Sequence, residues 1–255
     1  MKLGLFSDVH YCRENASYGN RKCALSFNKI TSALQDFKAQ KADYIISMGD
    51  LCDVNREHNT AESEECLLQI MREVDKTGIP FMQITGNHDC LVAPLDRLTA
   101  LTGVKLPPYT METPEFTLIC LDANDSSDGT HFGPEGFDWI DVNLPQEQLA
   151  FLKTALDASK KDCIVLIHEP VDSSTEEIFR VNNAAEVRKI LEASGKVKLV
   201  LQGHMHQYYD VIENGIRYIT VVGMCEGEEN RYMILDITKD RLEIQHITDK
   251  PCMNA

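Results

Sequence analysis

The feature that most constrains this chain is an alternation of short apolar runs and amphipathic segments near its start. The runs at residues 3–7, 43–48 and 81–85 predict strands, and the apolar periodicity over residues 21–38 and 61–76 predicts helices. A βαβαβ order of this kind favours a parallel sheet covered by helices. Because ligands of such sheets bind outside the carboxyl ends of the strands, the residues that follow each run are the first candidates for a site.

The rest of the chain carries further strand and helix signals around a long loop rich in Asp and Gly. We expect strands at residues 116–121, 163–167 and 198–201, helices at 145–159 and 184–194, and the loop at 122–143. Four short runs separated by turn residues follow, at residues 208–212, 216–222, 231–237 and 242–246. These four runs predict antiparallel strands that form part of a second sheet.

Length and composition narrow the class of protein. The chain has 255 residues with no linker signal, so we expect a single domain over residues 1–255. Its formal net charge of −15 disfavours nucleic acid and anionic membranes as partners. No apolar run approaches the roughly 20 residues that a membrane-spanning helix needs. With no signal peptide and nine cysteines that form no Cys-x-x-Cys pair, the chain is expected in the reducing cytoplasm.

Five short polar motifs follow the apolar strands, and they contain five of the eight histidines. Asp, Asn and His supply the oxygen and nitrogen ligands that suit Mn, Fe and Zn. In an extended segment alternate side chains face the same side, so Asp-x-His and His-x-His pairs can face one ion. Together the motifs predict a metal site. They are Asp8-Val9-His10, Gly49-Asp50-Leu51-Cys52-Asp53, Gly86-Asn87-His88-Asp89, His168-Glu169-Pro170 and Gly203-His204-Met205-His206.

With these motifs in this order, the chain resembles the calcineurin-like metallophosphoesterases from Asp8 to the strands after His206. The resemblance implies an α/β fold, a four-layer α-β-β-α sandwich of two mixed sheets flanked by helices. It also implies two divalent metal ions, Mn, Fe or Zn. By this resemblance one ion is held by Asp8, His10, Asp50 and His206, and the other by Asp50, Asn87, His168 and His204.

The resemblance also implies catalytic roles. His88 would stay off the metals within reach of the substrate, and Asp53 would hydrogen-bond His88 and set its orientation. A hydroxide that bridges the two ions would attack phosphorus, and His88 would protonate the leaving oxygen. The expected reaction is hydrolysis of a phosphodiester or pyrophosphate bond in a small nucleotide-like substrate.

Several alternatives stay open. Val54-Asn55 replace the Arg-Gly that follows the second Asp in phosphoprotein phosphatases, which disfavours a phosphoprotein substrate. The chain is similar both to manganese-dependent ADP-ribose/CDP-alcohol diphosphatases and to class III cyclic nucleotide phosphodiesterases, whose metal ligands are the same. A broad-specificity phosphomonoesterase is the alternative activity. A non-catalytic scaffold is disfavoured, because every expected ligand and His88 are present.

Further residues are candidates for substrate contacts. A basic group could contact a second phosphate or a nucleotide, or could belong to a solvated basic stretch. Two aromatic side chains could stack on a base or pack locally. Glu226 is a candidate for lining the pocket, His131 is expected to be structural, and the oligomeric state stays open. The basic candidates are Arg13, Arg21 and Lys22, and the aromatic ones are Tyr109 and Phe132.

Overall fold

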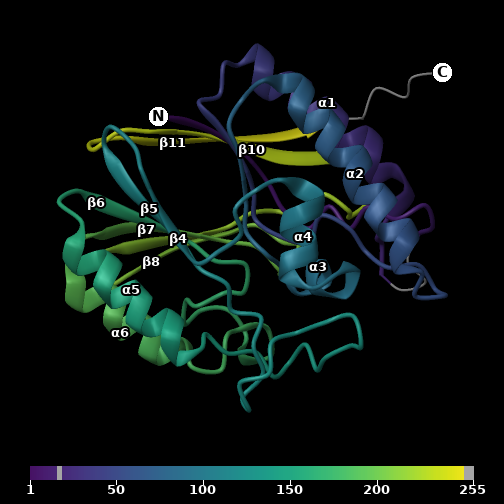
Figure 1. Cartoon of the computed structure of the whole chain (residues 1–255). Helices are drawn as coiled ribbons and strands as arrows, with labels where there is room; N and C mark the ends of the chain where they lie inside the picture. Colours follow the sequence, from purple (N-terminus) through teal and green to yellow (C-terminus); the bar gives the residue numbers. More distant parts are fainter. Residues whose placement is uncertain (16–18, 250–255) are drawn as a thin grey trace.

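The computed structural model describes residues 1–15 and 19–249 as two mixed β-sheets stacked between two layers of helices (Figure 1). This arrangement confirms the expected α-β-β-α sandwich. The first sheet has the order β11-β10-β1-β2-β3, with β1 (Lys2–Phe6), β2 (Tyr44–Ser47), β3 (Phe81–Gln83), β10 (Asn230–Ile237) and β11 (Leu242–Asp249). Strands β1, β2 and β3 are parallel, as their alternation with helices predicts.

The second sheet has the order β4-β5-β6-β7-β9-β8. Its four central strands are parallel, and antiparallel strands β4 and β8 form its edges. The strands are β4 (Tyr109–Glu112), β5 (Phe116–Cys120), β6 (Asp162–Leu166), β7 (Val197–Gln202), β8 (Tyr209–Glu213) and β9 (Ile216–Thr220).

The helices cover the outer faces of the two sheets. Helices α1 (Ser26–Ala39), α2 (Thr60–Thr77), α3 (Asn87–Val92) and α4 (Leu95–Thr102) lie on the side of the first sheet, and α5 (Gln146–Ala158) and α6 (Ala184–Ser194) cover the second. Two 3-10 helices, η1 (Cys23–Leu25) and η2 (Glu177–Phe179), complete the regular structure. No helix of the described residues is long and apolar enough to cross a membrane.

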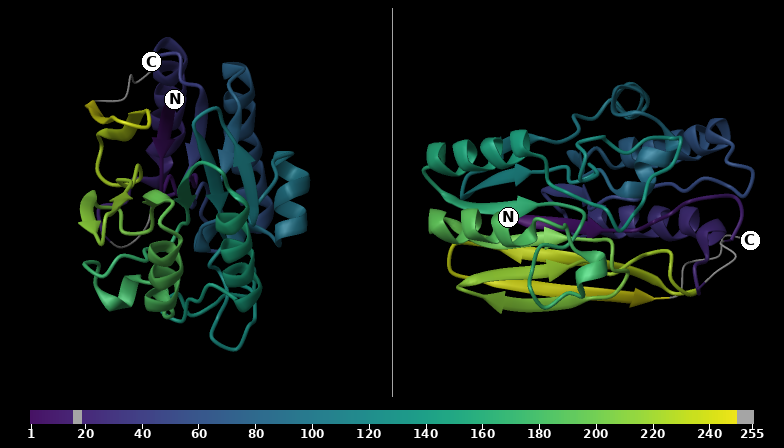
Figure 2. Two further views of the ribbon diagram at one scale, coloured as in Figure 1. Left: turned by 90° about the vertical axis from the view of Figure 1, so that its left-hand side faces the viewer. Right: turned by 90° about the horizontal axis from the view of Figure 1, so that it is seen from below.

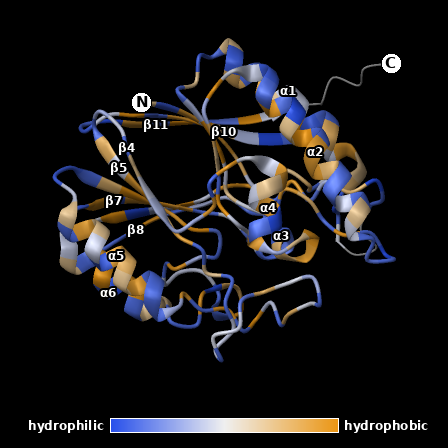
Figure 3. Ribbon diagram, in the orientation of Figure 1, coloured by the Kyte–Doolittle hydropathy of each residue, from blue (hydrophilic) through white to orange (hydrophobic). Residues whose placement is uncertain are grey.

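The core lies in three layers that follow the period of the strands. Leu3 and Leu5 of β1 face the second sheet, whereas Phe6 packs against the helices on the outer face. The apolar residues therefore line both the space between the sheets and the space under the helices (Figure 3). This alternation fixes the register of β1, because a shift by one residue would turn each side chain to the opposite face.

The C-terminal strands correct one prediction. We expected all four to belong to a second sheet, but β10 and β11 extend the first sheet, along one edge of the molecule in Figure 2. The reason lies in the apolar run from Tyr232 to Leu235, which is buried on both faces and of which Met233 to Leu235 pair antiparallel with β1. Strand β4 and helix α4 were not predicted from the sequence, and helix α1 begins only at Ser26.

A buried carboxylate tethers the long loop at residues 122–143. The Nε2 of His131 lies 3.1 Å from Asp122 Oδ2, and its Nδ1 lies 2.8 Å from the carbonyl oxygen of Phe132. Both ring nitrogens face acceptors, an arrangement that only a protonated imidazole satisfies fully. Burial alone would lower the pKa of His131, but the hydrogen bond and charge of Asp122 outweigh it and raise the pKa to about 9.

We therefore predict that this pair makes stability depend on pH. The pKa of His131 is about 9 in the folded chain and near its ordinary 6.5 in the unfolded one, so the stabilisation is complete below pH 6.5 and disappears as pH rises through 9. After allowance for partial exposure, its size is on the order of 1–2 kcal/mol. Urea unfolding of wild type and His131→Gln at several pH values measures it. Equal pH slopes between pH 7 and 10 would contradict the prediction.

Candidate metal centre

The seven predicted ligands converge at the carboxyl ends of parallel strands from both sheets. Each predicted ligand follows a buried strand, so the rigid sheets determine where its backbone leaves the core. Asp8 and His10 follow β1, Asp50 follows β2, Asn87 begins α3 after β3, His168 follows β6, and His204 and His206 follow β7.

The backbone at this place adopts an unusual conformation. Eight described residues other than glycine have positive φ, and five of them are predicted ligands. A left-handed backbone costs roughly 1–2 kcal/mol per residue, so its concentration at one place indicates a functional constraint. This conformation also corrects the prediction that an extended segment brings the Asp-x-His and His-x-His side chains together. Left-handed turns bring them together instead. The five φ values are 51° for Asp8, 46° for His10, 55° for Asp50, 69° for His204 and 57° for His206.

The first group of ligands brings two histidine nitrogens and a carboxylate oxygen face to face. The Nε2 atoms of His10 and His206 lie 3.1 Å apart. His206 Nδ1 donates a hydrogen bond to Glu226 Oε1 at 2.9 Å, and His10 Nδ1 lies 3.3 Å from Asp53 Oδ2. These contacts place a carboxylate beside each Nδ1, so Nε2 is the atom of each ring that can face a cation. Asp8 Oδ1 lies 3.3 Å from His206 Nε2 and has no hydrogen-bond partner among the described residues.

The second group shows the same arrangement. The Nδ1 of His168 donates to the carbonyl oxygen of Met48 at 2.6 Å, so its Nε2 is the atom that can face a cation. This Nε2 is buried, lies 3.3 Å from Asp50 Oδ2 and has no hydrogen-bond partner in the described part of the chain. The Nδ1 of His204 lies 3.2 Å from Asn87 Oδ1.

Divalent cations fit this set of donors. Nitrogen and oxygen ligand atoms packed this closely need a proton or a cation between them. Asp50 Oδ2 lies 3.4 Å from His10 Nε2 and 3.3 Å from His168 Nε2, so it belongs to both groups. Three-residue groups able to hold a metal ion include His10, Asp50 and His88 in one place and Asp50, His168 and His204 in another. The nitrogen and oxygen donors suit Mn, Fe or Zn.

The charges at the site also favour a cation. Burial alone would raise the pKa of Asp8 and Asp50, but His206 and His168 respectively outweigh it, and both pKa values fall below their ordinary range. Burial and a neighbouring histidine lower the pKa of His10 to about 4 and that of His204 to about 3. Burial alone would also lower the pKa values of His168 and His206, but Asp50 and Asp8 respectively outweigh it and raise both. The centre therefore combines ionised carboxylates with four imidazoles, and a cation would take the place of the extra protons on His168 and His206.

His88 and Asp53 lie beside this centre. His88 Nδ1 lies 2.9 Å from Asp53 Oδ1, the contact that the resemblance implied. The backbone N–H of His88 donates to Asp50 Oδ1 at 2.8 Å, which ties the start of α3 to the end of β2. Asp53 Oδ2 also lies 3.3 Å from His10 Nδ1, so one carboxylate faces two imidazoles. Sequence reasoning gave Asp53 only the first of these contacts.

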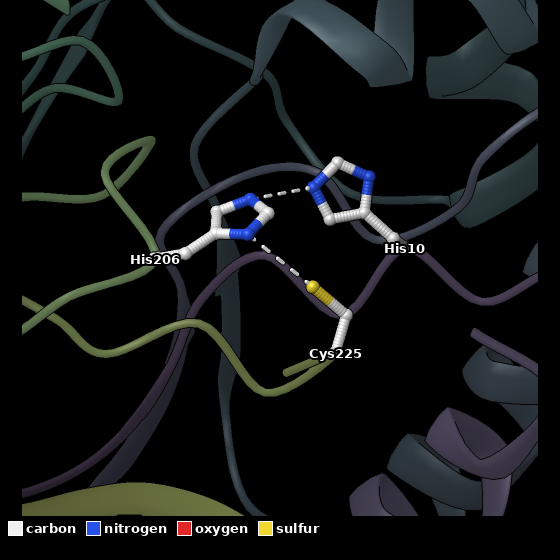
Figure 4. A group of neighbouring side chains, drawn as sticks. All are labelled: His10, His206 and Cys225. Carbon is white, nitrogen blue, oxygen red and sulfur yellow. Dashed lines mark hydrogen bonds between the residues drawn. The ribbon is translucent and has the colours of Figure 1, made fainter. Parts of the chain in front are cut away.

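Three supporting residues gained no structural role in our sequence analysis. Asp89 accepts hydrogen bonds from the backbone N–H groups of Asp50 at 2.9 Å and Leu51 at 2.8 Å. Glu226, named only as a pocket candidate, orients His206, and Cys225 Sγ lies 3.5 Å from His206 Nδ1 (Figure 4). Asp89 is the fourth residue of the Gly-Asn-His-Asp motif, and this position could have indicated its role. No sequence pattern near Glu226 indicated that it orients His206.

The other weak candidates divide between the site and the rest of the fold. Arg13 pairs with Glu65 at 2.8 Å, which favours the solvated alternative. Tyr109 is buried between the sheets and Phe132 stacks on Phe137 at 4.1 Å, so both pack locally. Arg21 lines a cavity of about 400 Å³ next to the predicted ligands. The cavity is also lined by Asn87, His88, Leu91, Gly136, Phe137, Trp139, Phe179 and His204.

Known proteins resemble this chain over most of its length. The 3′,5′-cyclic-nucleotide phosphodiesterase of Nostoc sp. is 25% identical over 229 residues, which cover 88% of this chain and 79% of that protein. The 3′,5′-cyclic adenosine monophosphate phosphodiesterase CpdA of Escherichia coli K12 is 24% identical over 205 residues, covering 78% and 67%. A dimetal phosphatase from Danio rerio shares the fold with a TM-score of 0.82, at 18% identity over 98% of both chains.

The model of the family described as calcineurin-like phosphoesterase matches residues 1–208. This match contains all five motifs and the strands that position them. The chain therefore belongs to the calcineurin-like phosphoesterase family.

Proposed function

We propose that this chain hydrolyses a phosphodiester or pyrophosphate bond in a small nucleotide-like substrate, with two divalent metal ions as cofactors. Membership of a phosphoesterase family makes hydrolysis of a phosphoric ester the reaction class. Relatives named cyclic-nucleotide phosphodiesterases support a diester as the substrate. The observation that carries the proposal is the convergence of histidine nitrogen and carboxylate oxygen atoms on both sides of the Asp50 carboxylate.

The predicted ligands divide around Asp50. Asp8, His10, Asp50 and His206 would hold one ion, and Asp50, Asn87, His168 and His204 the other. When bound, a cation pair supplies neutralisation of the phosphoryl oxygens and ionisation of a water near neutral pH. Asp53 holds Nδ1 of His88, which leaves Nε2 to give a proton to the leaving oxygen. Burial disfavours the imidazolium, but the charges of Asp53 and Asp50 raise the pKa of His88 and keep this proton in place.

We predict that Asp50→Asn removes metal and activity together. The substitution removes the negative charge shared by both groups of ligands, so two neighbouring cations lose the anion between them. We expect metal content below two ions per chain and turnover reduced on the order of 100-fold or more. Elemental analysis of the purified variant and a rate assay under the same divalent metal measure both. A variant that retains two ions and full turnover would remove Asp50 from the centre.

We predict that His88→Ala slows turnover while both ions stay bound. Loss of a general acid typically costs 10²–10⁴-fold in rate, and His88 is not in either predicted set of ligands. Asp53→Asn should cost less, because the imidazole of His88 stays in the site and loses only the charge that raises its pKa. Elemental analysis and kcat on a diester substrate measure these effects. Unchanged kcat in His88→Ala on every substrate tried would contradict the assigned role.

The choice between a diester and a monoester is tested with two chromogenic substrates under Mn²⁺. We expect faster turnover of bis-p-nitrophenyl phosphate than of p-nitrophenyl phosphate. A panel of cyclic nucleotides, ADP-ribose and CDP-alcohols then narrows the natural substrate. A strong preference for the monoester would favour a broad-specificity phosphomonoesterase. A chain that turns over none of these with any divalent metal would instead be a non-catalytic scaffold.

A further inference from the structure

Three aromatic rings form one wall of the cavity beside the predicted metal centre. Trp139 comes from the long loop, Phe179 ends η2, and His204 follows β7. The ring centroids lie 5.8 Å apart for Trp139 and Phe179, and 6.2 Å from His204 for each of them. Trp139 nevertheless keeps 38% of its surface exposed, in a place where a ligand would cover it. We call these three residues the aromatic wall.

Hydrogen bonds between two irregular segments hold the wall in place. The backbone N–H of Asn182 donates to the carbonyl oxygen of Val142 at 2.7 Å, and its side-chain amide donates to Asp141 Oδ1 at 3.0 Å. These bonds join the chain just after Phe179 to the chain just after Trp139. The two rings therefore come from segments far apart in sequence but tied directly to each other, which preorganises the wall before any ligand binds.

Arg21 supplies a positive charge to the same cavity. Its Nε lies 3.9 Å from Glu226 Oε1, and the same oxygen accepts the hydrogen bond from His206 Nδ1. Glu226 thus links the guanidinium to a predicted metal ligand. One cavity of about 400 Å³ therefore offers an aromatic surface, a guanidinium, and the edge of a centre that fits cations. These groups match a planar base, a sugar phosphate and the scissile phosphoryl group, respectively.

We propose that the aromatic wall binds the base of a nucleotide substrate, with Trp139 and Phe179 as specificity-determining residues. The inference rests on the proposed function and identifies which part of the substrate this cavity recognises. Because His204 belongs both to the wall and to the predicted ligands, a base held there stays within one nucleotide's reach of the phosphoryl group. Stacking on an aromatic side chain strengthens the binding of a base about 5- to 150-fold.

Trp139 is the only tryptophan of the chain, so its fluorescence reports on the wall directly. The metal-loaded full chain is titrated with adenosine monophosphate, ribose 5-phosphate and phosphocholine. We expect adenosine monophosphate to quench the emission saturably and the two probes without a base to leave it unchanged. Phe179→Leu should weaken binding of adenosine monophosphate about tenfold or more. The same variant should not change how strongly ribose 5-phosphate inhibits hydrolysis of a diester substrate. Phe151→Leu on α5, away from the cavity, serves as the matched control.

The outcomes separate this inference from the proposed function. Emission that does not respond to adenosine monophosphate, or that responds equally to ribose 5-phosphate or phosphocholine, overturns the base-binding wall. So does a Phe179→Leu variant with unchanged affinity for adenosine monophosphate. Saturable quenching in a chain that hydrolyses no phosphoester would preserve the wall and contradict the proposed activity instead. Hydrolysis without quenching would contradict only the wall.

Discussion

The site depends on how the buried carboxylate of Asp50 is held between two groups of imidazoles. Its Oδ1 accepts the backbone N–H of His88, its own N–H donates to Asp89, and its Oδ2 faces His10 and His168. Gly86 lets the segments that follow β2 and β3 lie close together, because a Cβ there would lie 2.2 Å from Asp50 Oδ1. The position of the carboxylate is therefore determined by backbone contacts, before any ligand is considered.

Holding these groups together costs free energy of folding, and the two sheets keep the groups rigidly in place. Ionised carboxylates and unpaired imidazole nitrogens are buried, and five ligands have a left-handed backbone. A core of close-packed side chains between the two sheets fixes the strand ends from which these ligands extend. Strain of this kind persists only where the surrounding structure determines it fully. A cation would relieve the repulsion among the ligands, so its binding would also stabilise the folded chain.

The sequence carried enough information for the fold and for which side chains converge, but not for how they do so. Apolar runs such as the one in β2 end directly at the polar motifs, and the carboxyl ends of parallel strands share one edge. Side-chain alternation, however, gave the wrong account of Asp8 and His10, because their left-handed φ angles are imposed by tertiary contacts. The same holds for β10, whose place beside β1 depends on burial of both its faces, a long-range pairing that local periodicity does not encode.

The two halves of the site arise from different kinds of structure. The predicted ligands come from strand ends and the start of α3, where the sheets fix them, whereas Trp139 and Phe179 come from irregular segments joined by hydrogen bonds of Asn182. His131 tethers the loop that carries Trp139, so a residue outside the predicted ligand set helps to hold one side of the cavity. The diphosphatases and the cyclic nucleotide phosphodiesterases that the sequence resembles have the same metal ligands. We therefore expect differences in substrate to arise in the irregular segments.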